Sequence, residues 1–210
     1  VNKPEDSSIV LYFDMPKVLP QRNEVQKSYL LAIESSIVRA ENFDRNKHQN
    51  FNKIFTWNDA FVDKKKYIKL NYSFRLPSEI YKNIKREYLC CLIVSHKNSS
   101  YKNELYSERK QLIRWFEKSH PEDFHLYGFG WDEFRFVDNK LERALNKIPF
   151  LRRFIYYLFA EKFSTYRGTV ESKSETMKTY RFAIAYENVK DELGYITEKI
   201  FDVFIAGCIA

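Results

Sequence analysis

The sequence predicts an α/β protein with parallel strands, and three observations support this fold class. Residues 87–96 ("EYLCCLIVSH") read as a buried strand, and a helical pattern followed by residues 123–128 ("DFHLYG") completes a β-α-β unit. Residues 182–207 ("FAIAYENVKDELGYITEKIFDVFIAG") read as a strand, a polar loop and a helix. The 210 residues are 44% hydrophobic and 17% aromatic, which is enough apolar material for the core of one large or two small domains.

The first part of the chain carries three short apolar runs, at residues 8–14, 28–34 and 52–57. We expect each run to be a buried strand, because polar loops separate them and each has strand length. The basic segment 63–86, which contains "RLPSEI", is predicted to be the crossing between two α/β blocks.

The second block begins with the strand at 87–96 and continues with a helix predicted for residues 101–118. The residues expected to face inward on this helix are Leu105, Leu112, Ile113 and Phe116. Residues 139–163 form an amphipathic, basic and aromatic segment that Pro149 interrupts. We expect this segment to pack against the sheet, and contact with a membrane surface is the alternative.

The last helix carries the strongest signal for a ligand. Apolar residues recur at helical spacing after Thr197, which is suited to an N-cap, so the helix is predicted to begin at Glu198 and to stop at Gly207. In open α/β sheets, ligands bind beyond the carboxyl ends of the strands, and a helix N-terminus attracts phosphate. Lys199 adds positive charge, and Glu198 is suited to accept hydrogen bonds from sugar hydroxyls. The pattern therefore favours a nucleotide-sugar diphosphate; alternatively, Glu198 only favours the helix dipole and Lys199 is solvated.

Most of the net charge of +7 lies in one segment. Between Asp63 and Arg86 the basic residues are Lys64, Lys65, Lys66, Lys69, Arg75, Lys82, Lys85 and Arg86. A basic stretch with interleaved aromatic residues is compatible with nucleic-acid binding. No recognised nucleic-acid motif accompanies it, so we favour a solvated face and expect no nucleic-acid partner.

The cysteines and histidines do not indicate a metal site. Cys90, Cys91 and Cys208 form no CxxC pair, and we expect buried thiols in a reducing compartment. The four histidines are dispersed, and the sequence contains no Asp-x-Asp pair of the kind that holds a divalent ion in many nucleotide-sugar enzymes. The sequence therefore predicts no metal ligands and no cofactor.

Residues 166–210 closely resemble the donor-binding signature of glycosyltransferase family 10, the α-1,3/1,4-fucosyltransferases. The hallmark of that family reads roughly Phe-x-x-x-Phe-Glu-Asn followed by Tyr-[Ile/Val]-Thr-Glu-Lys. Here it stands as Phe182, then Tyr186-Glu187-Asn188, and then Tyr195-Ile196-Thr197-Glu198-Lys199. Tyr186 occupies the position where Phe is usual.

Two upstream segments extend the resemblance over nearly the whole chain. "CLIVSHKNSSYKNELYSERKQLIRWF" resembles the strand, loop and helix that begin the donor domain, where the family usually has an arginine in the first helical turn for the diphosphate. At the matching position this chain has Lys102, which carries the same positive charge but cannot make the two parallel hydrogen bonds of an arginine. "SYLLAIESSIVRAENF" resembles, more loosely, the acceptor-domain strand that carries the catalytic base, and the matching residue is Glu34.

The resemblance implies a GT-B fold of two facing Rossmann-like domains, here residues 1–80 on the acceptor side and 81–210 on the donor side. It implies transfer of L-fucose from GDP-fucose with inversion and without a bound metal. In such a site the carboxylate of Glu198 binds the ribose hydroxyls, Lys199 meets the diphosphate and the sugar, and Tyr195 lies beside the nucleotide. Glu187 and Asn188 border the same pocket.

Three interpretations remain open on the sequence. The first is a fucosyltransferase of cell-surface glycan synthesis that acts on an oligosaccharide or glycolipid, and the second uses another nucleotide sugar. The third is a non-enzymatic basic module that binds nucleic acid or another anion.

The expected location is the cytoplasm, with the inner face of the bacterial plasma membrane or, in a eukaryote, the Golgi membrane as alternatives. Because the chain starts at Val1 and ends in "GCIA", which reads as the opening of another strand, we expect a fragment in which both domains are incomplete.

Overall fold

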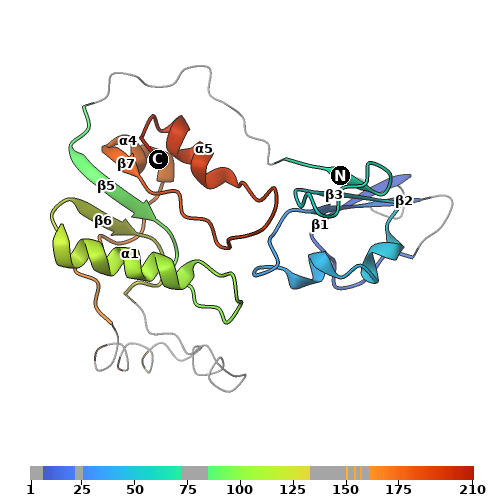
Figure 1. The fold of residues 1–210 in the computed structure, drawn as a ribbon, viewed down its shortest axis with the longest axis horizontal. Coiled ribbons are helices and arrows are strands. Elements are labelled where there is room, and N and C mark those ends of the chain that lie inside the picture. Colours follow the sequence, from blue (N-terminus) through green and yellow to red (C-terminus); the bar gives the residue numbers. More distant parts are fainter. Residues whose placement is uncertain are drawn as a thin grey trace. The chain divides into compact units, whose positions relative to one another are not determined.

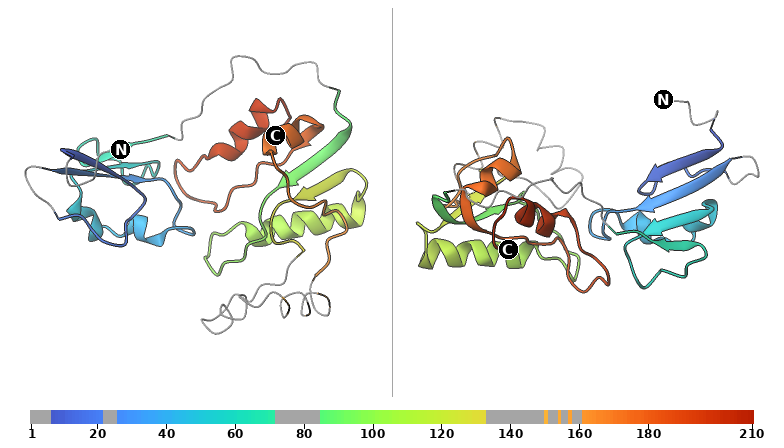
Figure 2. Two further views of the ribbon diagram at one scale, coloured as in Figure 1. Left: turned by 180° about the vertical axis from the view of Figure 1, so that it is seen from behind. Right: turned by 90° about the horizontal axis from the view of Figure 1, so that it is seen from above.

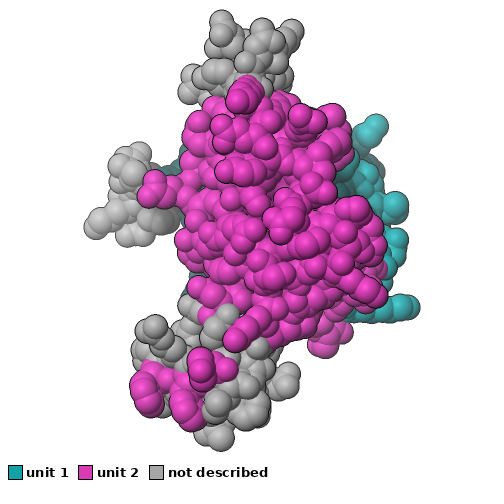
Figure 3. Space-filling view, turned by 90° about the vertical axis from the view of Figure 1, so that its left-hand side faces the viewer, with its two compact units in different colours: residues 1–74, 101–104, 187–198 teal, residues 75–100, 105–186, 199–210 magenta. Residues whose placement is uncertain are grey.

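The computed structural model describes residues 7–21, 26–71, 85–132, 150, 154, 157 and 161–210 (Figure 1). The chain divides into two compact units, which Figure 3 shows in different colours. Unit 1 comprises residues 1–74, 101–104 and 187–198, and unit 2 comprises residues 75–100, 105–186 and 199–210. Each unit contains one sheet of parallel strands, so the predicted α/β class is confirmed. The arrangement of two facing domains and its boundaries at 1–80 and 81–210 stay predictions.

The sheet of unit 1 has the strand order β1-β2-β3-β4, and all neighbouring strands are parallel. The strands are β1 (Ile9–Phe13), β2 (Lys27–Ala32), β3 (Lys53–Thr56) and β4 (Tyr67–Lys69). Two 3-10 helices, η2 (Ala40–Phe43) and η3 (Lys47–Asn50), connect β2 to β3. The core of this unit consists of Met15, Leu30, Ala32, Phe51 and Ile54.

The three strands expected in this region are therefore confirmed, each with ends that differ by one or two residues. Strand β4 was not predicted, because it lies in the basic segment 63–86 that we expected to be a crossing. All three of its residues are half-buried, so it lacks the apolar run that identified β2 and β3. Residues 72–84 of that segment lie outside the described residues.

The sheet of unit 2 has the order β6-β5-β7. Its parallel strands are β5 (Tyr88–Ile93), β6 (Phe124–Tyr127) and β7 (Tyr180–Ala183), and its helices are α1 (Tyr106–Ser119), α4 (Lys173–Lys178) and α5 (Glu198–Ile205). Alternate residues of β5 belong to two cores. Cys90 and Leu92 pack with Ile113 of α1, whereas Cys91 and Ile93 pack with residues of α4 and α5. Helices α1 and α4 therefore lie on opposite sides of the sheet (Figure 2).

Helix α1 begins five residues later than the sequence predicted, at Tyr106 instead of residue 101. Residues 101–104 form a turn, and Glu104 makes an antiparallel bridge with Val189. The expectation that Lys102 lies in the first turn of the helix is therefore wrong. Strand β7 spans Tyr180–Ala183, so it begins two residues before the predicted segment 182–207 and includes only the first two residues of that segment.

The end of α5 has the predicted glycine stop. Gly207 has φ +71, its N–H donates to the carbonyl of Phe204, and the N–H of Cys208 donates to the carbonyl of Val203. This pair of bonds is a Schellman motif, which only a residue tolerant of positive φ completes cheaply. The guanidinium of Arg86 donates to the carbonyl of Gly207 at 2.7 Å, and the chain continues to a parallel bridge between Phe182 and Ile209.

Within the described residues, no helix combines the length and the apolar character that a membrane span requires. The predicted amphipathic segment 139–163 lies almost entirely outside the described residues, so its packing stays a prediction.

Candidate functional site

The loops that leave the carboxyl ends of β5 and β7, together with the first turn of α5, carry all the predicted donor-binding residues. The chain order reverses between these strands, because β6 lies on one side of β5 and β7 on the other. Such a switch point is where open α/β sheets bind ligands. In unit 1 the two loops pair with each other. Lys190 donates its N–H to the carbonyl of Asn103 at 2.9 Å, next to the bridge between Glu104 and Val189.

The side chain of Glu187 fixes the start of α5. Its carboxylate accepts the backbone N–H of Thr197 at 3.0 Å, and the hydroxyl of Thr197 lies 2.7 Å and 2.9 Å from its two oxygens. Thr197 is buried and directly precedes the first helical residue, Glu198. Glu187, the first residue of the 187–198 segment, is thus hydrogen-bonded to Thr197, the residue before the helix. The predicted start of the helix at Glu198 is confirmed.

Tyr195 lies at the centre of the candidate site in unit 1. Its ring packs against Trp57, with 4.7 Å between the ring centroids. Burial raises the pKa of the Tyr195 phenol, and the nearby carboxylates of Glu187, Glu34 and Glu198 raise this pKa further. Glu34 therefore acts on the same phenol as Glu187 and Glu198, although it lies far from them in the sequence.

The tip of the loop packs closely against the ends of β3 and β4. Gly194 has φ +83, and a Cβ at this position would lie 2.5 Å from the carbonyl oxygen of Trp57. It would also lie 2.6 Å from Asp59 Oδ2 and from Lys69 Nζ, which belong to an ion pair. Glycine is therefore required here both by the backbone angle and by space.

Glu192 contributes a second polar contact of the loop. Its carboxylate accepts hydrogen bonds from the hydroxyl of Ser36 at 3.0 Å and from the phenol of Tyr101 at 3.2 Å. Ser36 follows Glu34 closely in the chain, so this contact holds the loop beside the segment that carries the predicted base. No sequence signal marked Glu192, because its partner Ser36 is 156 residues away.

The predicted cations and Asn188 have different surroundings. Lys102 is exposed in the 101–104 turn, which pairs with the start of the 187–198 loop. Asn188 is half-buried in that loop, and Lys199 is half-buried in the first turn of α5 and belongs to unit 2. The contacts that these three residues would make with a donor stay predictions.

Arg109 is a buried cation that the sequence analysis missed. It is 3% exposed in the first turn of α1, and its guanidinium donates to the carbonyl of Tyr186 at 3.2 Å. Its charged carbon lies 5.2 Å from the ring of Tyr106 and 5.7 Å from the ring of Tyr186. The spacing of Tyr106, Arg109 and Ile113 on one helical face is the signal that was available in the sequence.

No group of three or more histidine, cysteine or acidic residues that could hold a metal occurs in the described part of the chain. All three cysteines are buried free thiols, as expected, and burial raises the pKa of Cys90 to about 11. These thiols are therefore uncharged and are not candidates for catalysis.

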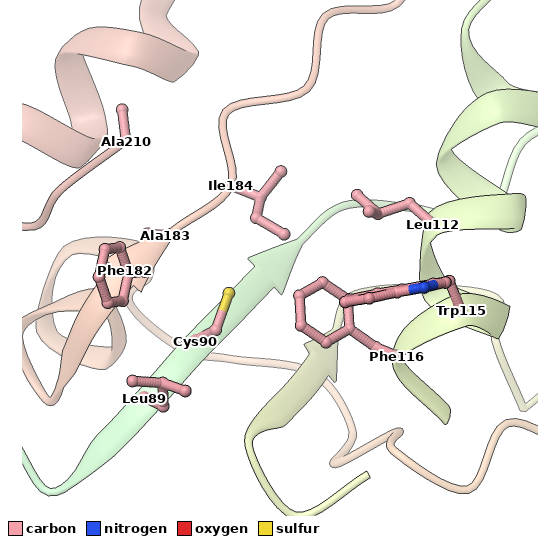
Figure 4. Close-up of a pocket in the computed structure, with 9 residues that line it drawn as sticks. All are labelled: Leu89, Cys90, Leu112, Trp115, Phe116, Phe182, Ala183, Ile184 and Ala210. Atoms are coloured by element: carbon pink, nitrogen blue, oxygen red, sulfur yellow. The ribbon is translucent and has the colours of Figure 1, made fainter. Parts of the chain in front are cut away.

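An apolar cavity of about 460 Å³ lies elsewhere in unit 2 (Figure 4). Leu112, Trp115 and Phe116 of α1 line one side, and Phe182 and Ile184 line the other. A nucleotide diphosphate needs cations and hydrogen-bond donors. The lining residues provide no charged side chain, so this cavity is not the candidate donor site.

No family model and no curated protein match the chain. Among solved structures the chain is similar to the one described as "Crystal Structure of TarM", with a TM-score of 0.48 and 9% sequence identity. The similarity covers 88% of this chain and 36% of that chain, so this chain spans about a third of its length. The resemblance to glycosyltransferase family 10 stays a prediction from residues 166–210.

The contact between Glu187 and Thr197 generates the first prediction. Replacing Thr197 by Val removes the hydroxyl and leaves the carboxylate with one fewer donor. The free energy of unfolding should fall by about 1–3 kcal/mol, the usual range for losing a hydrogen bond to a charged group. Urea unfolding measures this change. Thr197→Ser should restore most of the stability, because it keeps the hydroxyl.

The matched control is Thr176→Val, which removes a hydroxyl that donates to the carbonyl of Ser172 in an exposed part of α4. That variant should stay within about 0.5 kcal/mol of the parent. Equal stability of Thr197→Val and the parent would show that this hydroxyl does not hold the loop.

Proposed function

We propose that this protein is a glycosyltransferase that moves L-fucose from GDP-fucose to a hydroxyl of an oligosaccharide or glycolipid, with inversion and without a metal. The observation that carries the proposal is the pairing of the two switch-point loops, because these loops hold Lys102, Asn188 and Tyr195, and the second loop leads directly into Glu198 at the start of α5. The resemblance of residues 166–210 to the fucosyltransferase signature supplies the identity of the donor.

On the donor side, a departing GDP needs positive charge at the diphosphate as the bond to the sugar breaks. Lys199 in the first turn of α5 supplies a cation, and the N-terminal end of the dipole of that helix adds partial positive charge. Glu198 accepts hydrogen bonds from the ribose hydroxyls, and Tyr195 lies beside the nucleotide. Lys102 is the second cation of this proposal.

On the acceptor side, Glu34 is the proposed general base. Inversion requires a single displacement, in which the acceptor oxygen forms a bond to the anomeric carbon while the bond to the phosphate oxygen breaks. GDP leaves with the bonding electron pair, and the proton of the acceptor hydroxyl moves to the carboxylate of Glu34. The influence of Glu34 on the phenol of Tyr195 supports its place beside the predicted donor-binding residues.

A related donor is the second candidate. The residues assigned here contact the ribose and the diphosphate, which other nucleotide sugars share, whereas only Lys199 is assigned to the sugar. A thermal-shift panel of nucleotide sugars separates the two candidates. GDP-fucose should raise the melting temperature more than GDP-mannose or UDP-sugars at equal concentration.

The proposal is tested by transfer of label from GDP-[14C]fucose to a panel of oligosaccharides and glycolipids, with the complete natural chain and excess EDTA. We expect transfer to persist, because the proposed cations are side chains and a helix N-terminus. Loss of all transfer on chelation, restored by manganese, would contradict the metal-independent mechanism. Absence of transfer from GDP-fucose, with transfer from another nucleotide sugar, would establish the second candidate.

Donor binding gives a separate prediction. Lys199→Ala removes a cation from a dianionic diphosphate, so GDP binding should weaken by on the order of 1.5–3 kcal/mol in calorimetry. The matched control is Lys173→Ala, which removes an exposed lysine from α4 and should bind GDP like the parent. If both variants bind GDP equally tightly, the phosphate site lies elsewhere.

A substitution at Glu34 should change the rate of transfer without changing the affinity for GDP. Glu34→Gln keeps the shape of the side chain and removes the proton acceptor, so the transfer rate should fall by roughly 10² or more. GDP affinity should stay within about threefold of the parent. Glu171→Gln, at an exposed site of unit 2, is the control and should transfer normally. Normal turnover of Glu34→Gln would assign the base to another residue, and Glu41 and Asp44 would be tested next.

A further inference from the structure

Asp14 makes an unusual set of contacts at the end of β1. One oxygen of its carboxylate, Oδ1, accepts the backbone N–H groups of Ile33 and Glu34, each at 3.0 Å. The same oxygen accepts the side-chain amide of Asn42 at 2.7 Å. Asp14 has φ +56, a backbone angle that aspartate tolerates better than most residues. In a longer β1, main-chain carbonyl oxygens would accept the N–H groups of Ile33 and Glu34. The carboxylate of Asp14 accepts them instead.

Asn42 completes the network from the other side. Its side chain is 1% exposed, and its oxygen accepts the N–H of Met15 at 2.7 Å. Its amide nitrogen donates to Asp14 and, at 3.2 Å, to the carbonyl oxygen of Glu34. Each polar atom of this buried amide is therefore used, as buried polar groups require.

The main chain of Glu34 is consequently held at both of its polar groups. Its N–H is bound by a residue 20 positions away, and its carbonyl is bound by a residue 8 positions away. Glu34 follows the last residue of β2, Ala32, by two positions, where the strand ladder no longer constrains it. The two side chains thus fix the backbone from which the carboxylate of Glu34 extends.

We infer that Asp14 and Asn42 are positioning residues for Glu34, which they hold in the orientation that proton transfer from the acceptor hydroxyl requires. This inference rests on the proposed role of Glu34 as the base. Neither residue needs to contact the substrate. A reacting group must be placed within about 0.5 Å of its productive position, and a misplacement of about 1 Å costs up to about 10²-fold in rate.

The same unit contains a chemically matched comparison. Asp63 Oδ1 also accepts three hydrogen bonds, from the backbone N–H groups of Lys65, Lys66 and Tyr67 at 2.8, 2.9 and 2.9 Å. That turn is exposed and carries no residue assigned to the site. Loss of the Asp63 carboxylate therefore removes a cap of the same kind without moving Glu34.

The experiment compares Asp14→Ala, Asp14→Asn and Asp63→Ala in the transfer assay with GDP-fucose and the acceptor on which the parent is fastest. Asp14→Ala should lower kcat at least about tenfold and leave KM for GDP-fucose within about threefold, because the donor residues are untouched. Asp14→Asn keeps an oxygen acceptor and should recover at least about a third of the parental kcat. Asp63→Ala should keep the parental kcat.

The double variant Asp14→Ala/Glu34→Gln identifies the route of the effect. If Asp14 acts through Glu34, adding Asp14→Ala to Glu34→Gln should change kcat by no more than about twofold. A full additional tenfold loss in the double variant would overturn the inference, as would equal kcat for Asp14→Ala and Asp63→Ala. These outcomes are distinct from failure of the proposed function, which is normal transfer by Glu34→Gln or no transfer by the parent.

Hydrogen exchange provides a readout that does not depend on activity. Asp14→Ala should speed exchange of the Ile33 and Glu34 amides at least tenfold, and Asp63→Ala should leave them unchanged. If Asp14→Ala does not fold, Asn42→Asp takes its place, because it keeps the shape and the bond to Met15 but turns a donor into an acceptor facing Asp14. It should show the same loss of kcat, and parental kcat in this variant would overturn the inference.

Discussion

The carboxylate of Glu187 is the contact on which the geometry of the 187–198 loop depends. It accepts both the N–H and the hydroxyl of Thr197, so one side chain closes a loop that spans ten positions of sequence. A carboxylate beside the first turn of α5 is also favoured by the helix dipole. The same loop is also held by the pairing of Val189 and Lys190 with the 101–104 turn and, nearer its tip, by Glu192 and Gly194. The resemblance places Glu187 at the border of the donor pocket, and the structure gives it a partner inside the protein.

Side-chain carboxylates pair backbone N–H groups at two places in the structure, beyond the end of a strand and before the start of a helix. A parallel strand that stops leaves N–H groups of its neighbour without a ladder partner, and buried groups of this kind must be paired. Asp14 pairs those beyond the end of β2, and Glu187 pairs the N–H that precedes α5. Because ligands bind at the carboxyl ends of parallel strands, the same contacts that satisfy the backbone also position the candidate site.

The sequence predicted the parts of the fold that depend on local pattern. Strands β2, β3 and β5 were found because parallel strands with two covered faces read as continuous apolar runs. The start of α5 was found because Thr197 and Glu198 have the chemistry of a helix N-terminus. Strand β4 was not predicted because it is short and half-buried. The start of α1 was predicted too early because the pairing of Glu104 with Val189 overrides the helical pattern. Contacts such as Ser36 with Glu192 join residues too far apart for any local pattern to indicate.

The surroundings of Tyr195 bear on which residues of the candidate site we propose as hydrogen-bond donors and which as the proton acceptor. Burial is the main cause that raises the pKa of its phenol; Ser35 lowers this pKa and three carboxylates raise it further, and the net upward shift keeps the group protonated where Glu and Asp are ionised. A protonated phenol donates a hydrogen bond but does not accept a proton, so we do not propose Tyr195 as the general base. Glu187 accepts hydrogen bonds from Thr197, and Glu198 is assigned to the ribose. Of the carboxylates that act on this phenol, Glu34 is the one to which we assign the acceptor hydroxyl, and that proposed role depends on how firmly its backbone is held.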